Sequence, residues 1–222
     1  MLAPTLTGSG DRAHLLTREV GLDTHVTDLV NVFEYEDIED AVLVAHSYGG
    51  MVASGALEQI GDRVRFLVLL DGHMPRTGES VFDLNGPARA DAMIALADEA
   101  GEGWFIPPAT AGRYGVTDPV DAAWVEARMT AQPLKTYTDR IGATDRMWSH
   151  RGMFVECVPS SLEPHLLARA RARAAADPSF AYRVLPAAHN AMVTAPDALA
   201  DLLLGVVRSP TGTELARAPS PE

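Results

Sequence analysis

The 222-residue sequence is poor in cysteine and lysine and contains no long apolar run. Its single cysteine, Cys157, excludes an internal disulfide, and we therefore expect a cytoplasmic protein. Lys135 is the only lysine, and 18 basic residues stand against 30 acidic ones, which gives a net charge of −12. Such a balance repels phosphate groups, so we expect no nucleic-acid partner and no membrane partner. No apolar run approaches the roughly 20 residues of a membrane span, and no signal-peptide pattern follows Met1.

Strand and helix patterns alternate along most of the chain. The hydrophobic content of 47% suffices for one domain with a substantial core. The spacing of apolar residues predicts strands at 41–45, 64–71, 152–158 and 180–185 and helices at 24–35, 51–60, 162–176 and 195–207. We expect Asp23 or Thr24 to cap the first helix and Thr194 to cap the last. Strand, helix and strand in this order predict a parallel sheet flanked by helices.

The middle of the chain lacks strand patterns. Helical spacing occurs near 88–100 and 119–131, where Asp118 is a suitable cap and Pro119 a suitable first residue. We therefore expect a helical lid at about 77–148, inserted into a core formed by 1–76 and 149–208. Residues 2–6 resemble the end of a strand, and residues 209–222 are rich in Pro, Ser and Thr, as in a mobile tail.

The stretch at residues 41–50, AVLVAHSYGG, places a serine between an apolar strand and a helix. This arrangement describes a nucleophile elbow, in which Ser47 sits on a strained, sharp turn. Bulky side chains two positions away on either side would collide with the strand and the helix. Ala45 and Gly49 meet that demand, although glycine is usual at the first of these positions.

A serine nucleophile needs a base, and the base needs a carboxylate that orients it. His189 follows the last predicted strand, where hydrolases with such an elbow carry the base. Asp71 ends the strand after that of Ser47, whereas the loop at 159–162 offers no acid. The backbone N–H of Tyr48 is the expected oxyanion donor. The sequence therefore predicts a triad of Ser47, His189 and Asp71.

Four stretches together resemble bacterial α/β-hydrolases of the esterase type, which are similar to plant methylesterases and hydroxynitrile lyases. The stretches are APTLTGSGDRAHLL from Ala3, VAHSYGGM from Val44, LDGHMP from Leu70 and HNAMVTAP from His189. The resemblance implies an α/β-hydrolase fold and the triad named above. It also implies that about three N-terminal strands and the loop with the second oxyanion donor are missing. Their absence would leave β-strand edges unpaired.

The resemblance leaves three functions open. The first is a serine hydrolase that cleaves a small carboxylic ester through an acyl-enzyme, with no cofactor. The second is a hydroxynitrile-lyase-like enzyme that uses the same residues for proton transfer, and the third is an inactive truncated homologue. We expect His73, Trp104 and Trp124 to contact the substrate, although core packing would also explain the tryptophans. The histidines show no metal-ligand spacing, so we expect no metal.

Overall fold

The computed structural model describes residues 1–209 and places a parallel sheet at the centre of the molecule. Its strands are β1 (Ala41–His46), β2 (Val64–Leu70), β5 (Gly152–Cys157) and β6 (Phe180–Leu185), in the order β1-β2-β5-β6. All three strand pairs are parallel. The predicted parallel sheet flanked by helices is therefore confirmed. β1 lies at one edge of the sheet, and its Val44 is 39% exposed.

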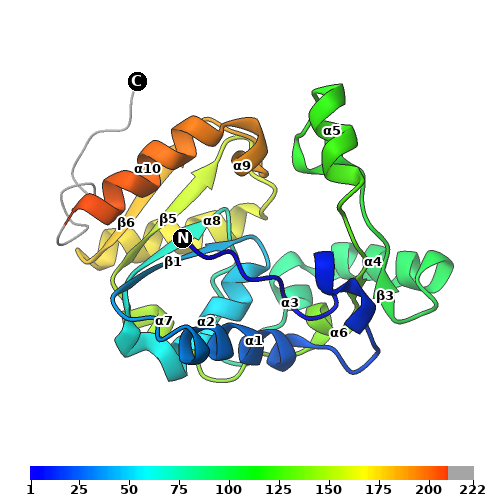
Figure 1. Ribbon diagram of the computed structural model, residues 1–222, viewed down its shortest axis with the longest axis horizontal. Coiled ribbons are helices and arrows are strands. Elements are labelled where there is room, and N and C mark those ends of the chain that lie inside the picture. Colours follow the sequence, from blue (N-terminus) through cyan, green and yellow to red (C-terminus); the bar gives the residue numbers. More distant parts are fainter. Residues whose placement is uncertain (210–222) are drawn as a thin grey trace.

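The two faces of the sheet belong to two different cores, because side chains alternate along each strand. Leu67, Leu69 and Phe154 face the larger core, which contains α1 (Leu22–Tyr35), α2 (Gly49–Ile60) and α8 (Pro164–Ala176). Val68 and Val155 face the smaller core, which α9 (Ala191–Thr194) and α10 (Pro196–Arg208) cover. Figure 1 shows α10 on one side of the sheet and α1 and α2 on the other.

The segment between β2 and β5 is mostly helical, and we call residues 77–148 the inserted segment. It contains α3 (Val81–Asn85), α4 (Pro87–Ala100), η3 (Ala111–Tyr114), α5 (Pro119–Glu126), α6 (Lys135–Thr138) and the start of α7 (Asp145–Ser149). The two predicted helices are present, with Asp118 as the cap of α5, which ends five residues earlier than predicted. A short antiparallel pair, β3 (Phe105–Ile106) and β4 (Gln132–Pro133), was not predicted. In Figure 1, α5 stands apart from the other helices.

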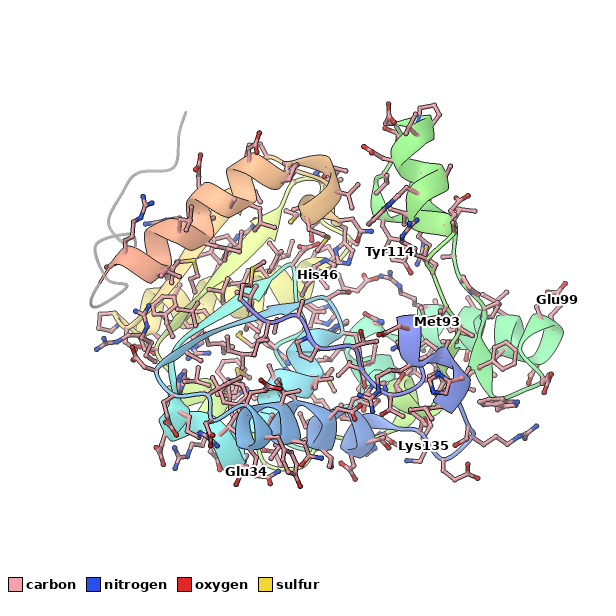
Figure 2. The ribbon with its side chains drawn as sticks, in the orientation of Figure 1. Glu34, His46, Met93, Glu99, Tyr114 and Lys135 are labelled. Atoms are coloured by element: carbon pink, nitrogen blue, oxygen red, sulfur yellow. The ribbon has the colours of Figure 1, made fainter. Side chains whose placement is uncertain are left out.

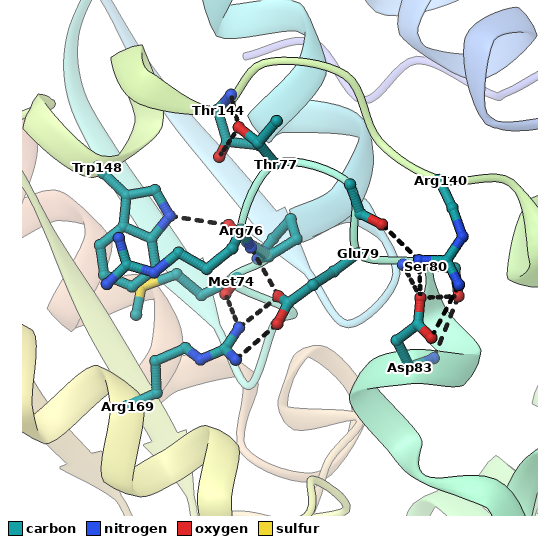
Figure 3. Close-up of polar contacts among 12 residues, drawn as sticks. Met74, Arg76, Thr77, Glu79, Ser80, Asp83, Arg140, Thr144, Trp148 and Arg169 are labelled. Atoms are coloured by element: carbon teal, nitrogen blue, oxygen red, sulfur yellow. Dashed lines mark hydrogen bonds and ion pairs between the residues drawn. The ribbon is translucent and has the colours of Figure 1, made fainter.

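Polar contacts hold the first residues of the inserted segment against α8 (Figure 3). The guanidinium of Arg169, on α8, donates to both carboxylate oxygens of Glu79 at 2.6 and 2.8 Å and to the carbonyl of Met74 at 3.1 Å. The indole of Trp148 donates to the carbonyl of Pro75 at 2.8 Å, and the Arg76 guanidinium lies over the Trp148 ring. The chain that leaves β2 is thus tied to the core before it enters α3.

The first residues of the chain do not form the strand predicted at 2–6. Polar groups of Thr5 and Thr7 are bonded to side chains instead of to a neighbouring strand. The backbone N–H and the hydroxyl of Thr7 both donate to the carboxylate of Asp28, at 2.7 and 2.9 Å, and Arg12 donates to the carbonyl of Thr5 at 2.9 Å. The segment continues into η1 (Gly10–Leu15). It is therefore anchored on α1.

Two predicted helix caps are wrong. α1 begins at Leu22 after Gly21, because Asp139 of the inserted segment accepts the Leu22 N–H at 3.0 Å. Thr194 ends α9 and does not cap α10, which follows Ala195 and begins at Pro196. The predicted tail, apart from Ser209, lies outside the described residues.

The start of α2 packs tightly against the loop after β2. A Cβ atom at Gly50 would lie 2.1 Å from the carbonyl oxygen of His73, whereas a Cβ atom at Gly49 would meet nothing closer than the Ala45 Cβ at 4.0 Å. The tightest steric demand at this turn therefore falls on Gly50, one residue after the position singled out from the sequence. This contact fixes the distance between the Ser47 turn and the loop that follows Asp71.

We expect Gly50→Ala to lower the free energy of unfolding by about 1–3 kcal/mol, because backbone atoms must move to admit the methyl group. The matched change Gly49→Ala should stay within about 0.5 kcal/mol of the parent. Urea denaturation followed by circular dichroism measures both. Equal midpoints for the two variants would contradict the packing described here.

Candidate active site

Ser47 lies on the turn between β1 and α2 in a strained backbone conformation. Its φ angle is +52°, which is uncommon for a residue with a side chain. Hydrogen bonds from both sides hold the turn: the Ser47 N–H donates to the Leu70 carbonyl at 3.2 Å, and the His73 N–H donates to the Ser47 carbonyl at 3.0 Å. The predicted elbow geometry is therefore present, and β2 with its following loop supports it.

His189 lies in the loop after β6 and contacts Ser47 directly. Its Nε2 is 3.0 Å from the Ser47 Oγ, and its Nδ1 is 2.6 Å from Asp71 Oδ2. His189 is 4% exposed, so its ring is almost closed off from solvent. Residues that are 142 and 118 positions from His189 in the sequence are thus brought within hydrogen-bond distance of its two ring nitrogens.

Asp71 follows β2 and is fully buried, with a φ angle of +40°. Burial opposes its ionisation, but hydrogen bonds from His189, from the Ser160 hydroxyl and from the Ser161 N–H outweigh burial, and the pKa of Asp71 is lowered. The carboxylate is therefore ionised at neutral pH and accepts a hydrogen bond from the Nδ1–H of His189. In the neutral imidazole, Nε2 then carries no hydrogen, and the Ser47 hydroxyl donates to it.

The loop after β5 supplies the partners of Asp71 that the sequence did not reveal. The Ser160 hydroxyl donates to Asp71 Oδ1 at 2.6 Å, and the Ser161 N–H donates to Oδ2 at 3.3 Å. From the sequence alone this loop has no expected role, because it contains no acid. Its contribution could not be recognised without knowing that β5 lies beside β2, since that adjacency brings the two strand ends together.

His46 packs against His189. Its Nε2 donates to the His189 carbonyl at 2.9 Å, and the two ring centroids are 4.5 Å apart. Burial, followed by the neighbouring His189, lowers the pKa of His46 to about 4, so this ring is neutral at pH 7. The Tyr114 ring, from the inserted segment, also stacks on the His189 ring, with centroids 5.9 Å apart. The histidine of the site is therefore held between β1 and the inserted segment.

Tyr48 is placed by a second chain of hydrogen bonds. The carbonyl of Thr7 accepts from Nε2 of His25 at 2.9 Å, so Nδ1 of His25 accepts from the Tyr48 hydroxyl at 3.0 Å. The backbone N–H of Tyr48 lies at the N-terminus of α2, where the first N–H groups have no partner within the helix. The same end of the helix favours negative charge.

A cavity of about 610 Å³ opens over Ser47 and His189. Tyr48 and His73 line it, as do Tyr114 and Tyr137 of the inserted segment. Nε2 of His73 lies 3.4 Å from the Asn85 side-chain oxygen, and burial lowers the pKa of His73, so its ring is neutral. His73 therefore lies where a substrate contact was expected.

Trp104 and Trp124 do not line this cavity, so the structure does not bring these two predicted substrate contacts to Ser47 and His189. The Trp104 indole donates to Glu102 at 3.2 Å and lies under the Arg18 guanidinium. Trp124 is 54% exposed, and the Arg128 guanidinium covers its ring. Both rings find partners on the outside of the inserted segment, which sequence spacing could not indicate.

Within residues 1–209 there is neither a cluster of metal ligands nor a helix suited to cross a membrane. No group of three or more His, Cys, Asp or Glu side chains in this range is arranged to hold a metal ion. None of the helices in the same range combines the length and apolar character that crossing a bilayer requires.

One curated relative and two solved structures show what the chain is similar to. It is 36% identical over 147 residues to the carbendazim hydrolyzing esterase of Nocardioides sp. (strain SG-4G), an alignment that covers 62% of this chain and 59% of that protein. An extracellular alpha/beta-hydrolase from a Paenibacillus species superimposes with a TM-score of 0.73 at 17% identity, over 93% of this chain and 86% of that one. A methylesterase from Arabidopsis superimposes with a TM-score of 0.63 at 17% identity, over 91% and 84%.

The chain spans about three fifths of the length of the curated relative. The resemblance to esterases and plant methylesterases that the four sequence stretches carry is confirmed. The model of the alpha/beta hydrolase family matches residues 1–202. With the parallel sheet, the Ser47 turn and the two solved neighbours, this match shows that the chain belongs to the alpha/beta hydrolase family.

Proposed function

We propose that the protein is a serine hydrolase that cleaves a small carboxylic ester through Ser47, His189 and Asp71. The observation that carries the proposal is the position of the His189 ring, 3.0 Å from the Ser47 Oγ and 2.6 Å from Asp71. A base in contact with both a hydroxyl and an orienting carboxylate is what an activated serine requires. The esterase name of the curated relative supports an ester as the substrate.

In the proposed reaction, Ser47 Oγ attacks the ester carbonyl carbon while His189 Nε2 takes the hydroxyl proton. Asp71 stabilises the imidazolium that forms. His189 then gives the proton to the departing alcohol oxygen, and an acyl group remains on Ser47. A water molecule, deprotonated by His189, attacks the acyl carbon, and the Ser47 oxygen leaves with the proton. The bond-making and proton-transfer steps use only side chains of the protein and water.

The negative charge on the carbonyl oxygen needs hydrogen-bond donors during both steps. We assign one donor to the Tyr48 N–H, because Tyr48 directly follows Ser47 at the start of α2. The hydrogen-bond chain from Thr7 through His25 to the Tyr48 hydroxyl keeps this residue in place. Loss of one such donor costs about 100- to 1000-fold in rate in other enzymes.

A cytoplasmic location and a small-molecule ester as the substrate, with no nucleic-acid and no membrane partner, remain part of the proposal. The single cysteine, Cys157, is free and buried, so no disulfide within the chain requires an oxidising compartment. Fractionation of the native host with an antibody against the protein tests the location directly.

Replacing Ser47 by Ala should abolish hydrolysis of p-nitrophenyl acetate, with a loss of up to about 10⁶-fold in kcat, because no other hydroxyl within residues 1–209 contacts His189 Nε2. Ser149→Ala is the matched control, since Ser149 lies on α7 and does not line the cavity, and it should retain parental activity. Absorbance of p-nitrophenolate measures both. Undiminished turnover in Ser47→Ala would contradict the proposal, and cyanohydrin cleavage without ester turnover would favour the lyase.

The lowered pKa of Asp71 has a consequence for the pH profile. The carboxylate becomes protonated only below its usual pKa of about 4, so it stays ionised at pH 5 and above. Asp71 therefore adds no second proton to the loss of activity between pH 5 and 7. We expect kcat/KM to fall about tenfold per pH unit on the acid side, with a slope of one. A slope of two between pH 5 and 7 would show that Asp71 titrates there as well.

Ser160 is a positioning residue in this scheme because it acts only through Asp71. We expect Ser160→Ala to raise the pKa of Asp71 and to lower kcat/KM by about 10-fold, the cost of one hydrogen bond to a charged group. Ser160→Thr keeps the hydroxyl and should retain most of the activity. The pH profile separates this role from a merely structural one. Only the loss of a hydrogen bond to the Asp71 carboxylate would make kcat/KM fall more steeply with decreasing pH. Parental kcat/KM and pH profile in folded Ser160→Ala would contradict it.

A further inference from the structure

The cavity over Ser47 continues into a second cavity of about 390 Å³ that lies within the inserted segment. Five of the residues that line both are Arg89, Met93, Arg113, Tyr114 and Tyr137. Figure 2 labels Met93 and Tyr114, which belong to α4 and η3, and His46, which lines only the first cavity. A bound molecule can therefore extend from Ser47 past Arg89 and Arg113.

The charge of this double cavity is opposite to that of the protein. The chain carries 30 acidic and 18 basic residues, yet Arg89 and Arg113 are the only charged residues among those that line the two cavities. Asp71 lies beneath the site with its carboxylate bonded to His189, Ser160 and Ser161, and it is fully buried. The wall that a ligand meets thus carries positive charge.

The two arginines differ in how far their charge is already balanced. Nη1 of Arg89 donates to the Ser161 carbonyl at 3.2 Å and lies 3.4 Å from Glu163, while its Nε has no hydrogen-bond partner. Arg113 forms no ion pair and no side-chain hydrogen bond within residues 1–209. Arg113 is therefore the guanidinium that remains available, and Arg89 is the one closer to the triad through Ser161.

Beyond the arginines the wall becomes apolar. Leu96, Ile106, Pro107 and Pro108 line the second cavity but not the first. This distribution suits a molecule whose scissile group lies at Ser47 and whose remainder passes the arginines. Guanidinium groups bind carboxylates through paired, charge-assisted hydrogen bonds.

We propose that the preferred substrate is an ester that bears a carboxylate several bonds from the scissile carbonyl, and that Arg113, assisted by Arg89, binds this carboxylate. The proposal rests on the ester hydrolysis proposed above and adds the substrate class. The net charge of the protein repels anions at a distance, so the preference depends on these two local charges.

Two matched pairs of esters test the proposal at about 0.15 M salt, where distant charges are screened beyond roughly 8 Å. Monomethyl adipate and methyl hexanoate differ by a carboxylate on the acyl side. 4-Acetoxybenzoate and phenyl acetate differ by a carboxylate on the alcohol side. Proton release in a pH-stat gives kcat/KM for each ester.

Arg113→Gln is the test variant, and Arg128→Gln is its control. Arg128 lines neither cavity, and its guanidinium donates to the Trp124 carbonyl. Replacing it by Gln changes the net charge of the protein by the same amount as Arg113→Gln does. We expect the parent and Arg128→Gln to prefer the charged ester of at least one pair. In Arg113→Gln this preference should fall by about 5- to 10-fold. The effect is modest because an exposed guanidinium contributes less binding free energy than a buried one. Arg113→Lys keeps the charge and should retain part of the preference.

The outcomes separate this proposal from the one on which it rests. The anion site is contradicted if the parent hydrolyses the neutral esters well and does not prefer the charged ones. It is also contradicted if the preference for the charged ester survives in Arg113→Gln. Both results are compatible with ester hydrolysis. Absence of turnover with every ester contradicts ester hydrolysis.

A binding measurement then decides the anion site independently of catalysis. In the Ser47→Ala background, titration calorimetry should show tighter binding of monomethyl adipate than of methyl hexanoate, and the difference should shrink in Ser47→Ala/Arg113→Gln. Equal affinities in the Ser47→Ala protein would overturn the proposal.

Discussion

The hydrogen bond between His189 Nδ1 and the buried carboxylate of Asp71, 2.6 Å long, is the contact on which the rest of the site depends. It sets the tautomer of the imidazole, and the tautomer decides that Ser47 donates to Nε2. The carboxylate can play this part only while ionised, and a fully buried carboxylate is costly to ionise without partners. Ser160 and Ser161 provide those partners from the neighbouring strand end.

The sheet makes this contact possible because its parallel strands end at one edge. Ser47 follows β1, Asp71 follows β2, the Ser160 loop follows β5 and His189 belongs to the loop after β6. Ser47 and Asp71 both have positive φ angles, each of which costs about 1–3 kcal/mol, so the surrounding structure must enforce them. The close packing of Gly50 on the His73 backbone is part of that enforcement.

The parts of the site that depend on local pattern could be predicted from the sequence. A serine between an apolar strand and two glycines, a histidine after the last strand and an aspartate at a strand end each carry their own signal, and the structure brings all three together. Ser160 could not be found in this way, because its importance comes from the order β1-β2-β5-β6. Residues 2–6 failed as a strand for a related reason: an apolar segment becomes a strand only where another strand pairs with it. The positions of Trp104 and Trp124 depend on the path of the inserted segment. The apolar residues of this segment as a whole follow no regular period from which its path could be predicted.

Covalent labelling of the serine tests the central claim most directly. A fluorophosphonate reacts with a hydroxyl that a neighbouring imidazole activates, and mass spectrometry locates the adduct. The account predicts one phosphonyl group per chain, on Ser47, together with loss of labelling in His189→Gln. An unlabelled chain under conditions that label a known serine hydrolase, or an adduct on another residue, would contradict it.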